Sequence, residues 1–202
     1  EQCRLSGTKE GCASGDCGAC TGVVARTASD ALVYEPINAC IATLGSLHGA
    51  QLITVEQLAT PKLHPVQQAM VDLHGSQCGF CTPGFVMSLF ALYQRRRRPD
   101  FGQTQSAREH AILEALGGNL CRCTGYRPIV DASARALESD FCDVFEQREP
   151  ETRERLSELQ ASSSDSLTLC GDETRYLRPR DAAELAQQLA AHPHARLVAG
   201  GT

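Results

Sequence analysis

Four cysteines near the start of the chain have a spacing that suits metal binding. Three follow a C-x4-C-x2-C pattern and a fourth comes later, and together they are Cys12, Cys17, Cys20 and Cys40. A binuclear iron-sulfur cluster takes four thiolates, and this spacing is one that holds such a cluster. Gly11, Gly15 and Gly18 lie between the cysteines, where a residue without Cβ lets the backbone bend closely around an inorganic core. The pattern predicts one 2Fe-2S site, with a zinc or disulfide-rich loop as the alternative.

A second set of four cysteines lies within an internal repeat over residues 64–137. It consists of a C-x2-C pair and a C-x-C pair, namely Cys78, Cys81, Cys121 and Cys123. In each copy a helical apolar pattern ends at a glycine, Gly75 or Gly118, and a proline, Pro83 or Pro128, follows the cysteines. Glycine suits a helix end and proline suits the first turn of a helix. The repeat predicts two helical hairpins that bring four thiols together at helix N-termini, where the helix dipole favours thiolates.

The second cysteine set, taken alone, fits zinc and iron-sulfur equally well. Beside a first iron-sulfur site, a second cluster is the better interpretation, because two clusters in series can pass electrons along. The remaining cysteines lack ligand spacing and are predicted to be bystander or free thiols: Cys3, Cys142 and Cys170. The histidines His64, His74 and His110 are also not spaced as metal ligands, so we expect structural or exposed roles for them.

Two kinds of element must position these thiols, which makes the predicted fold class α+β. Apolar and β-branched patterns predict strands over residues 21–28 and 31–34, joined by a turn at 29–30, and a closing strand over 51–55. The apolar periodicity of the repeat predicts four helices, one of which carries Arg95–Arg98 at its C-terminal end. Those arginines are predicted to form a solvated helix end, with a partner-docking patch as the alternative.

The last part of the chain differs in composition. Residues 146–167 are polar and charged, which predicts a linker, and residues 181–191 predict a short amphipathic helix capped by Asp181. A buried strand is expected over 196–199, leading into Gly200-Gly201-Thr202. A strand that opens into such a turn can cradle a phosphate, because bare backbone N–H groups can approach an anion closely.

Composition limits the classes of function. The chain has 202 residues and a formal net charge of -5, which argues against general nucleic-acid binding, and no apolar run reaches the roughly 18 residues that a membrane span needs. Thiols reserved for metals fit a reducing compartment, so we expect a cytoplasmic protein. The chain begins without Met and ends at Thr202, and we expect further residues on both sides.

Five motifs together resemble the molybdenum hydroxylase family, and within it the small, iron-sulfur and flavin subunit of bacterial xanthine dehydrogenases. They occupy residues 7–12, 15–20, 38–40, 77–85 and 118–129. The resemblance implies a β-grasp, ferredoxin-like 2Fe-2S domain over 1–60 that lacks its opening hairpin. It further implies a four-helix 2Fe-2S domain over 61–145, a linker over 146–167, and the start of an FAD-binding domain over 168–202.

The resemblance also implies a function in electron transfer. Electrons from a molybdopterin centre in a large partner subunit would pass through the helical-domain cluster, the ferredoxin-like cluster and FAD to NAD, while hypoxanthine or xanthine is hydroxylated. Gln77 and Cys123 would hydrogen-bond the pterin. The flavin contacts implied at the C-terminus are Leu197, Val198, Ala199, Gly200, Gly201 and Thr202. The assembly would be a heterotetramer or larger.

Two alternatives remain open at this point. One is the iron-sulfur subunit of an aldehyde, carbon monoxide or N-heterocycle hydroxylase, in which the flavin usually sits on another chain; the linker and flavin-domain start favour xanthine dehydrogenase. The other is a zinc-stabilised interaction protein with no redox role, which would be colourless.

Overall fold

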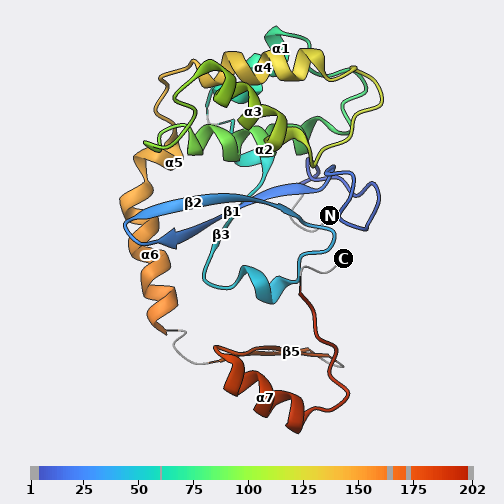
Figure 1. Ribbon diagram of the computed structural model, residues 1–202, viewed down its shortest axis with the longest axis vertical. Helices are drawn as coiled ribbons and strands as arrows, with labels where there is room; N and C mark the ends of the chain where they lie inside the picture. Colours follow the sequence, from blue (N-terminus) through green and yellow to red (C-terminus); the bar gives the residue numbers. More distant parts are fainter. Residues whose placement is uncertain (1–4, 60, 163–165, 172–173, 200–202) are drawn as a thin grey trace.

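The computed structural model describes residues 5–59, 61–162, 166–171 and 174–199 (Figure 1). Its strands are β1 (Thr21–Ala28), β2 (Ala31–Asn38), β3 (Gln51–Ile53), β4 (Leu167–Cys170) and β5 (Arg175–Arg178). Its α-helices are α1 (Pro65–Asp72), α2 (Thr82–Arg95), α3 (Gln105–Leu116), α4 (Arg127–Leu137), α5 (Val144–Gln147), α6 (Glu149–Ser162) and α7 (Ala182–Ala191). Two 3-10 turns are η1 (Leu44–Leu47) and η2 (Val55–Gln57). Within the described ranges, no helix is both long enough and apolar enough to cross a bilayer.

The first sheet is antiparallel with strand order β2-β1-β3. β1 has the predicted bounds, and Ser29 takes a left-handed φ of 51° in the turn to β2. β2 continues past the predicted residue 34 and includes Pro36, which is tolerated because β2 is an edge strand whose proline need not donate to a neighbour. β3 ends before the predicted residue 55, where the chain turns into η2.

The four helices of the repeat form as predicted. Pro83 and Pro128 lie in the first turns of α2 and α4, and the Thr104 side chain caps α3 by accepting the Ala107 N–H at 3.2 Å. The prediction that glycine provides the helix stop after α1 needs correction. The left-handed residue there is His74, with φ 55°, and the Gly75 N–H donates to the Met70 carbonyl at 2.8 Å.

Helix α2 joins the helical region to the sheet. Phe85 and Phe90 on α2 are fully buried and share one hydrophobic core with Val23 and Ile53 of the sheet. The ring of Tyr34 on β2 meets Phe90 edge-on, with ring centroids 5.9 Å apart. The regions over 1–60 and 61–145, which the sequence predicts as separate domains, therefore share their packing.

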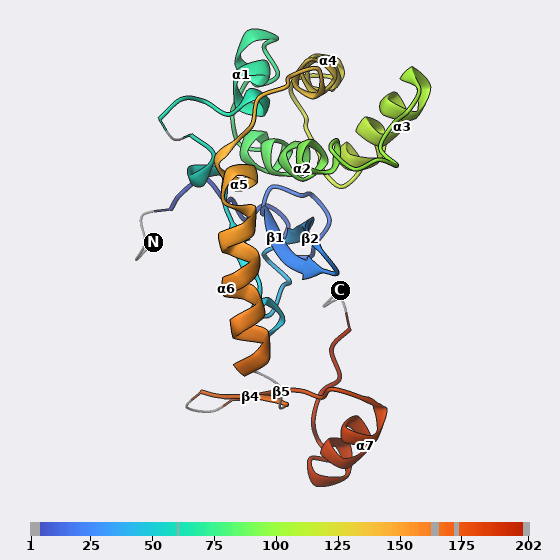
Figure 2. The ribbon, with the colours of Figure 1, turned by 90° about the vertical axis from the view of Figure 1, so that its left-hand side faces the viewer.

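Residues 146–167, predicted as a linker, contain the 14-residue helix α6. This helix runs alongside β1 and β2 (Figure 2), and Leu156 on it is buried. The Glu149 carboxylate accepts the Leu32 N–H at 3.0 Å, and the Thr27 hydroxyl donates to Gln160 at 2.9 Å. A single buried leucine gives little apolar periodicity, which is why the polar sequence did not predict this helix.

The C-terminal part consists of the β4–β5 hairpin and α7, and it lies at the opposite end of the molecule from α1–α4 (Figure 1). The Asp181 side chain caps α7 as predicted, accepting the Glu184 N–H at 2.8 Å. The predicted buried strand over 196–199 is wrong: these residues form no strand, and Leu197 and Val198 are exposed. Among the described residues no neighbouring strand pairs with them, and an unpaired strand leaves its backbone groups to water. Gly200-Gly201-Thr202 lie outside the described residues.

Candidate metal centres

The first candidate centre is the loop between Cys12 and Cys20. The Cys12 Sγ accepts three backbone N–H groups, from Ser14, Asp16 and Cys17, each at 3.4 Å. A hydrogen bond from the Ser14 side chain, together with these N–H groups, lowers the pKa of Cys12 to about 5. The loop therefore favours the thiolate, which is the form that binds iron.

Cys40 is brought to this loop by the end of β2. The Asn38 side chain donates to the Gly15 carbonyl at 2.8 Å, and the Cys40 N–H donates to the Cys20 Sγ at 3.5 Å. Burial, and then the hydrogen bond with the Cys20 side chain, raise the pKa of Cys40, and Cys12 contributes in the same direction. Cys12, Cys20 and Cys40 thus interact through their thiols, and Cys17 joins them through its N–H to Cys12.

The second candidate centre brings the two cysteine pairs of the repeat together. Burial, and then a hydrogen bond with the Cys121 side chain, raise the pKa of Cys81 to about 12. A hydrogen bond with the Cys78 side chain raises the pKa of Cys123. Each interaction joins a cysteine of one repeat to a cysteine of the other, so the two cysteine pairs lie side by side. Cys81 also occupies the N-cap of α2, as the dipole argument expects.

Two residues beside Cys121 shape this second loop. The Thr124 hydroxyl lies 3.2 Å from the Cys121 Sγ, and the Thr124 N–H donates to the same sulfur at 3.5 Å. The Tyr126 hydroxyl accepts the Cys121 N–H at 2.9 Å. Tyr126 holds a left-handed φ of 68° at the N-cap of α4. The sequence motif contains both residues, but their roles follow only from these contacts.

The residues of both centres fit 2Fe-2S clusters in donor chemistry, and the second loop also leaves open space. Each iron of such a cluster takes two thiolates, which agrees with the contacts Cys81–Cys121 and Cys78–Cys123. A Cβ added at Gly79, with φ 83°, or at Gly125, with φ 69°, would meet nothing within 4 Å, so the second loop leaves open space. In the described part of the chain, no three His, Cys, Asp or Glu side chains are grouped so that they could hold a metal ion.

The two centres touch one another through their loops. The Leu120 N–H, next to Cys121, donates to the carbonyl of Cys17 at 2.9 Å. A Cβ on Gly18 would lie 2.2 Å from the Gly118 carbonyl, so only glycine, which also holds φ 68° here, allows the loops to approach this closely. One hydrogen bond therefore connects Cys17, a predicted ligand of the first centre, with the residue before Cys121, a predicted ligand of the second.

The predicted pterin contacts lie in the middle of the chain and the predicted flavin contacts at its C-terminal end. Gln77 and Cys123 are both exposed at the second centre, where Cys123 contacts Cys78. Leu197 and Val198 are exposed, and Ala199 also lies in the exposed C-terminal segment. Leu197, Val198 and Ala199 therefore do not line an enclosed site.

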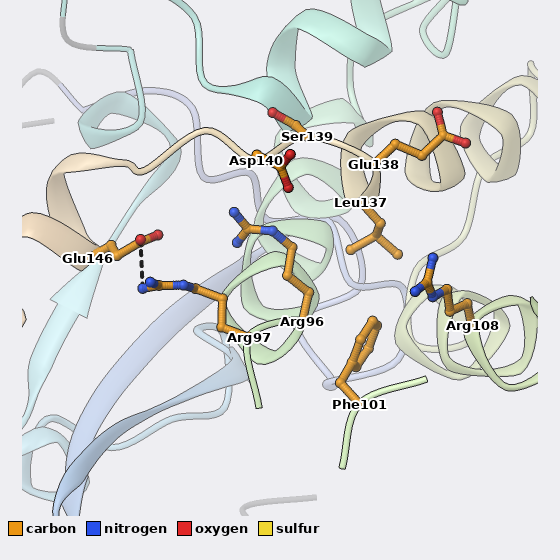
Figure 3. A pocket seen from close by; sticks show the side chains of 9 residues that line it. All are labelled: Arg96, Arg97, Phe101, Arg108, Leu137, Glu138, Ser139, Asp140 and Glu146. Carbon is orange, nitrogen blue, oxygen red and sulfur yellow. Dashed lines mark ion pairs between the residues drawn. The ribbon is translucent and has the colours of Figure 1, made fainter. Parts of the chain in front are cut away.

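A surface cavity of about 490 Å³ lies away from both centres, between the end of α2 and the segment after α4 (Figure 3). Arg97 forms an ion pair with Glu146 at 2.7 Å. Arg96 lies 3.4 Å from the centre of the Tyr93 ring and donates to the Phe141 carbonyl at 3.1 Å. These two arginines are thus engaged within the chain, where they tie α2 to α5, and the cavity lining contains no cysteine.

Comparison with known proteins identifies the family of the chain. Residues 54–134 match the 2Fe-2S binding domain. The chain is 36% identical to aldehyde oxidase 3 of Mus musculus, over 98% of this chain and 17% of that protein. It is 35% identical to xanthine dehydrogenase of Drosophila subobscura, over 100% of this chain and 17% of that protein.

A solved structure extends the likeness to the fold. A chain of quinoline 2-oxidoreductase from Pseudomonas putida 86 superposes with a TM-score of 0.53 at 32% identity, covering 66% of this chain and 75% of that one. The match to the 2Fe-2S binding domain agrees with the cysteines in the two adjacent loops. Together with these relatives, it identifies the family. The chain belongs to the molybdenum hydroxylase family, and it carries that family's 2Fe-2S binding domain.

Proposed function

We propose that this chain is the electron-transfer part of a xanthine dehydrogenase of the bacterial, multi-subunit type. It would pass electrons from a molybdopterin centre on a large partner subunit, through two 2Fe-2S clusters, to FAD and then to NAD. The chain spans 17% of the length of the curated relatives compared above, so substrate chemistry belongs to parts outside it. Its thiol-rich centres suit the reducing cytoplasm.

The observation that carries this proposal is the hydrogen bond between the two cysteine loops. Each cluster, when bound, takes up and releases one electron at a time. The residues of this chain hold the clusters and fix their separation: the Cys17 carbonyl accepts the Leu120 N–H at 2.9 Å, and Leu120 is bonded directly to Cys121.

The surface around the second centre supports a partner on that side. Cys78 and Cys123 are exposed. Around them, large apolar side chains face solvent, with exposed fractions of 47% for Phe80, 52% for Leu120 and 37% for Tyr126. Apolar groups gathered around exposed ligands suit a surface that another subunit covers. We therefore place the molybdopterin subunit here, where Gln77 and Cys123 can reach the pterin.

The first centre would serve the flavin side. The Tyr176 ring of β5 lies against Gly45, since a Cβ there would be 2.1 Å from the ring. Gly45 belongs to η1, which starts shortly after Cys40. This contact seats the C-terminal part, proposed as the start of the FAD-binding domain, against the turn that follows Cys40. Electrons would leave through the first cluster.

Aldehyde oxidation is the second candidate. Aldehyde oxidase 3 and xanthine dehydrogenase match this chain at 36% and 35% identity, and both matches span nearly all of it. The C-terminal part is therefore aligned in both relatives and does not discriminate between the two substrates. Assays of the assembled enzyme with xanthine and with an aromatic aldehyde would decide between them.

The test of the proposed function combines metal analysis with cysteine variants. Iron, sulfide, flavin and molybdenum are measured in the purified complex, which should be red-brown and bleach on reduction with dithionite. Cys81→Ser and Cys121→Ser should each remove the same one of two cluster signals in electron paramagnetic resonance, because both belong to one predicted ligand set. Cys17→Ser should remove the other signal.

Cys142→Ser is the matched control, since Cys142 is an exposed thiol outside both centres, and it should keep both signals. Zinc in place of iron, or both signals retained in Cys81→Ser and Cys121→Ser, would overturn the assignment.

A further inference from the structure

Asn119 lies buried between the two cysteine loops, with 3% of its surface exposed. Its side-chain N–H groups donate to the Gly18 carbonyl at 2.9 Å and to the Thr21 hydroxyl at 3.2 Å. Its side-chain oxygen accepts the hydroxyl of Ser88, on α2, at 2.6 Å. Asn119 therefore links the first cysteine loop, the start of β1 and helix α2, although Gly18 is 101 positions away in the chain.

The surroundings of this amide leave little freedom. A Cβ on Gly84 of α2 would lie 2.1 Å from the Gly18 carbonyl, and one on Gly18 would lie 2.5 Å from the Asn119 side-chain nitrogen. The backbones are thus in close contact around Asn119. Removing its amide would take one donor from the buried Gly18 carbonyl, which would keep the Thr21 N–H and hydroxyl. It would also leave the buried Ser88 hydroxyl without its acceptor, and a buried polar group without a partner is costly. The loops would separate to admit water.

We propose that Asn119 is a positioning residue that holds the two cluster-binding loops together and thereby sets the coupling between the clusters. This inference rests on the proposed function. In the proposed electron transfer, one electron moves from a reduced cluster to an oxidised one. No covalent bond is made or broken in this step. Asn119 donates to no cysteine sulfur; it acts by keeping the Cys17 carbonyl against the Leu120 N–H.

The test uses the full, cluster-loaded complex with both clusters reduced. Two paramagnetic clusters that lie close together split each other's signals in electron paramagnetic resonance at low temperature. Asn119→Leu keeps the side-chain size and removes the hydrogen bonds, and Ser88→Ala removes only the donor to Asn119. Ser133→Ala is the matched control, because Ser133 is equally buried but donates within α4, to the Ile129 carbonyl at 2.7 Å.

We expect both cluster signals to persist in every variant. The splitting between them should be lost in Asn119→Leu, narrowed in Ser88→Ala and unchanged in Ser133→Ala. If Asn119→Leu does not assemble, Ser88→Ala decides by itself: a narrower splitting than in Ser133→Ala supports the proposal, and an equal one overturns it.

Failure of the proposed function gives a different result. Wild-type protein with fewer than two cluster signals would contradict the relay itself. Wild-type protein with both signals but no splitting would leave the relay in place and overturn the role of Asn119.

Discussion

His64 and Asp143 form a buried polar pair that connects two helix starts. The His64 Nδ1 accepts the Val66 N–H at 3.2 Å and so caps α1, while its Nε2 lies 3.0 Å from an Asp143 carboxylate oxygen. The other Asp143 oxygen accepts the Glu146 N–H at 2.8 Å and caps α5. Although burial opposes its ionisation, hydrogen bonds from His64 and Glu146 hold the pKa of Asp143 below its ordinary value. The charged carboxylate therefore favours the folded state.

Replacing Asp143 with Asn should lower the free energy of unfolding by about 1.5 to 3 kcal/mol at neutral pH, the range for a hydrogen bond to a charged group. Because the folded pKa is lowered, this contribution is present above the ordinary value of 3.8 and is lost as the pH falls through the folded pKa. The difference between wild type and Asp143→Asn should therefore shrink below that value. Urea unfolding over a pH series measures it.

Asp131→Asn is the matched control for this prediction. Asp131 pairs with Arg127 on the surface of α4, with 46% of its side chain exposed, and such pairs contribute about 0.5 kcal/mol or less. Equal losses of stability in the two variants would contradict the argument, because burial would then make no difference.

Residue spacing was enough to propose the two cysteine sets, which stay a prediction, but not the polar residues between them. Cysteines carry their chemistry in a short pattern, so the quartets could be proposed from C-x4-C-x2-C, C-x2-C and C-x-C. Asn119 has partners such as Gly18 and Ser88 that lie on distant parts of the chain, and no local pattern identifies them. His64 was expected to be structural, which its cap on α1 agrees with.

At the scale of elements, η1 is the joint between the sheet and the C-terminal part. The Arg26 side chain on β1 donates to the Ser46 carbonyl at 2.7 Å, which ties the turn to the sheet. On its other side, Tyr176 packs on Gly45 and the Arg178 side chain donates to the His48 carbonyl at 3.4 Å. One short turn therefore carries the contacts that seat the β4–β5 hairpin.

Gly45→Ala should loosen that joint. The added Cβ would lie 2.1 Å from a ring carbon of Tyr176, so the hairpin must move away while the sheet stays intact. Backbone N–H groups of residues 167–178 should then exchange faster with deuterium than in wild type, as measured by mass spectrometry. Gly22→Ala on β1 is the control, because its Cβ would make only ordinary contacts of 3.6 Å. Unchanged exchange in Gly45→Ala would show that the hairpin does not depend on this contact.

The sequence predicted elements where local signals were strong. Helices α1, α2 and α4 have apolar periodicity, α2 and α4 have prolines in their first turns, and α3 was predicted as the counterpart of α1 in the repeat. Helix α6 lacks such a pattern, because its contacts to β1 and β2 are polar apart from Leu156. The strand expected over 196–199 failed for the opposite reason: its residues suit a strand, but the described chain provides no neighbour to pair with it.

For the whole molecule, one hydrophobic core connects regions that carry different thiol centres. Phe90 is fully buried on α2. Its ring centre lies 5.9 Å from that of Tyr34 on β2, 5.4 Å from that of His64 and 4.9 Å from that of Phe145 on α5. The sheet, the helical region and the segment leading to α6 thus meet at one side chain, so a loss of packing there should reach both centres.

Phe90→Ala should destabilise the sheet and the helices together, by about 3 to 5 kcal/mol for a buried phenylalanine. The measurement is urea unfolding of the cluster-loaded protein, followed by far-ultraviolet circular dichroism for the backbone and visible circular dichroism for the clusters. The unfolding midpoints of both signals should move to lower urea concentration. The two transitions should still coincide, since a shared core unfolds as one cooperative unit. Leu113→Ala is the control, because Leu113 on α3 is 58% exposed and should change little. If the backbone signal shifted while one cluster signal stayed at its wild-type midpoint, the two regions would be independent domains despite their contact.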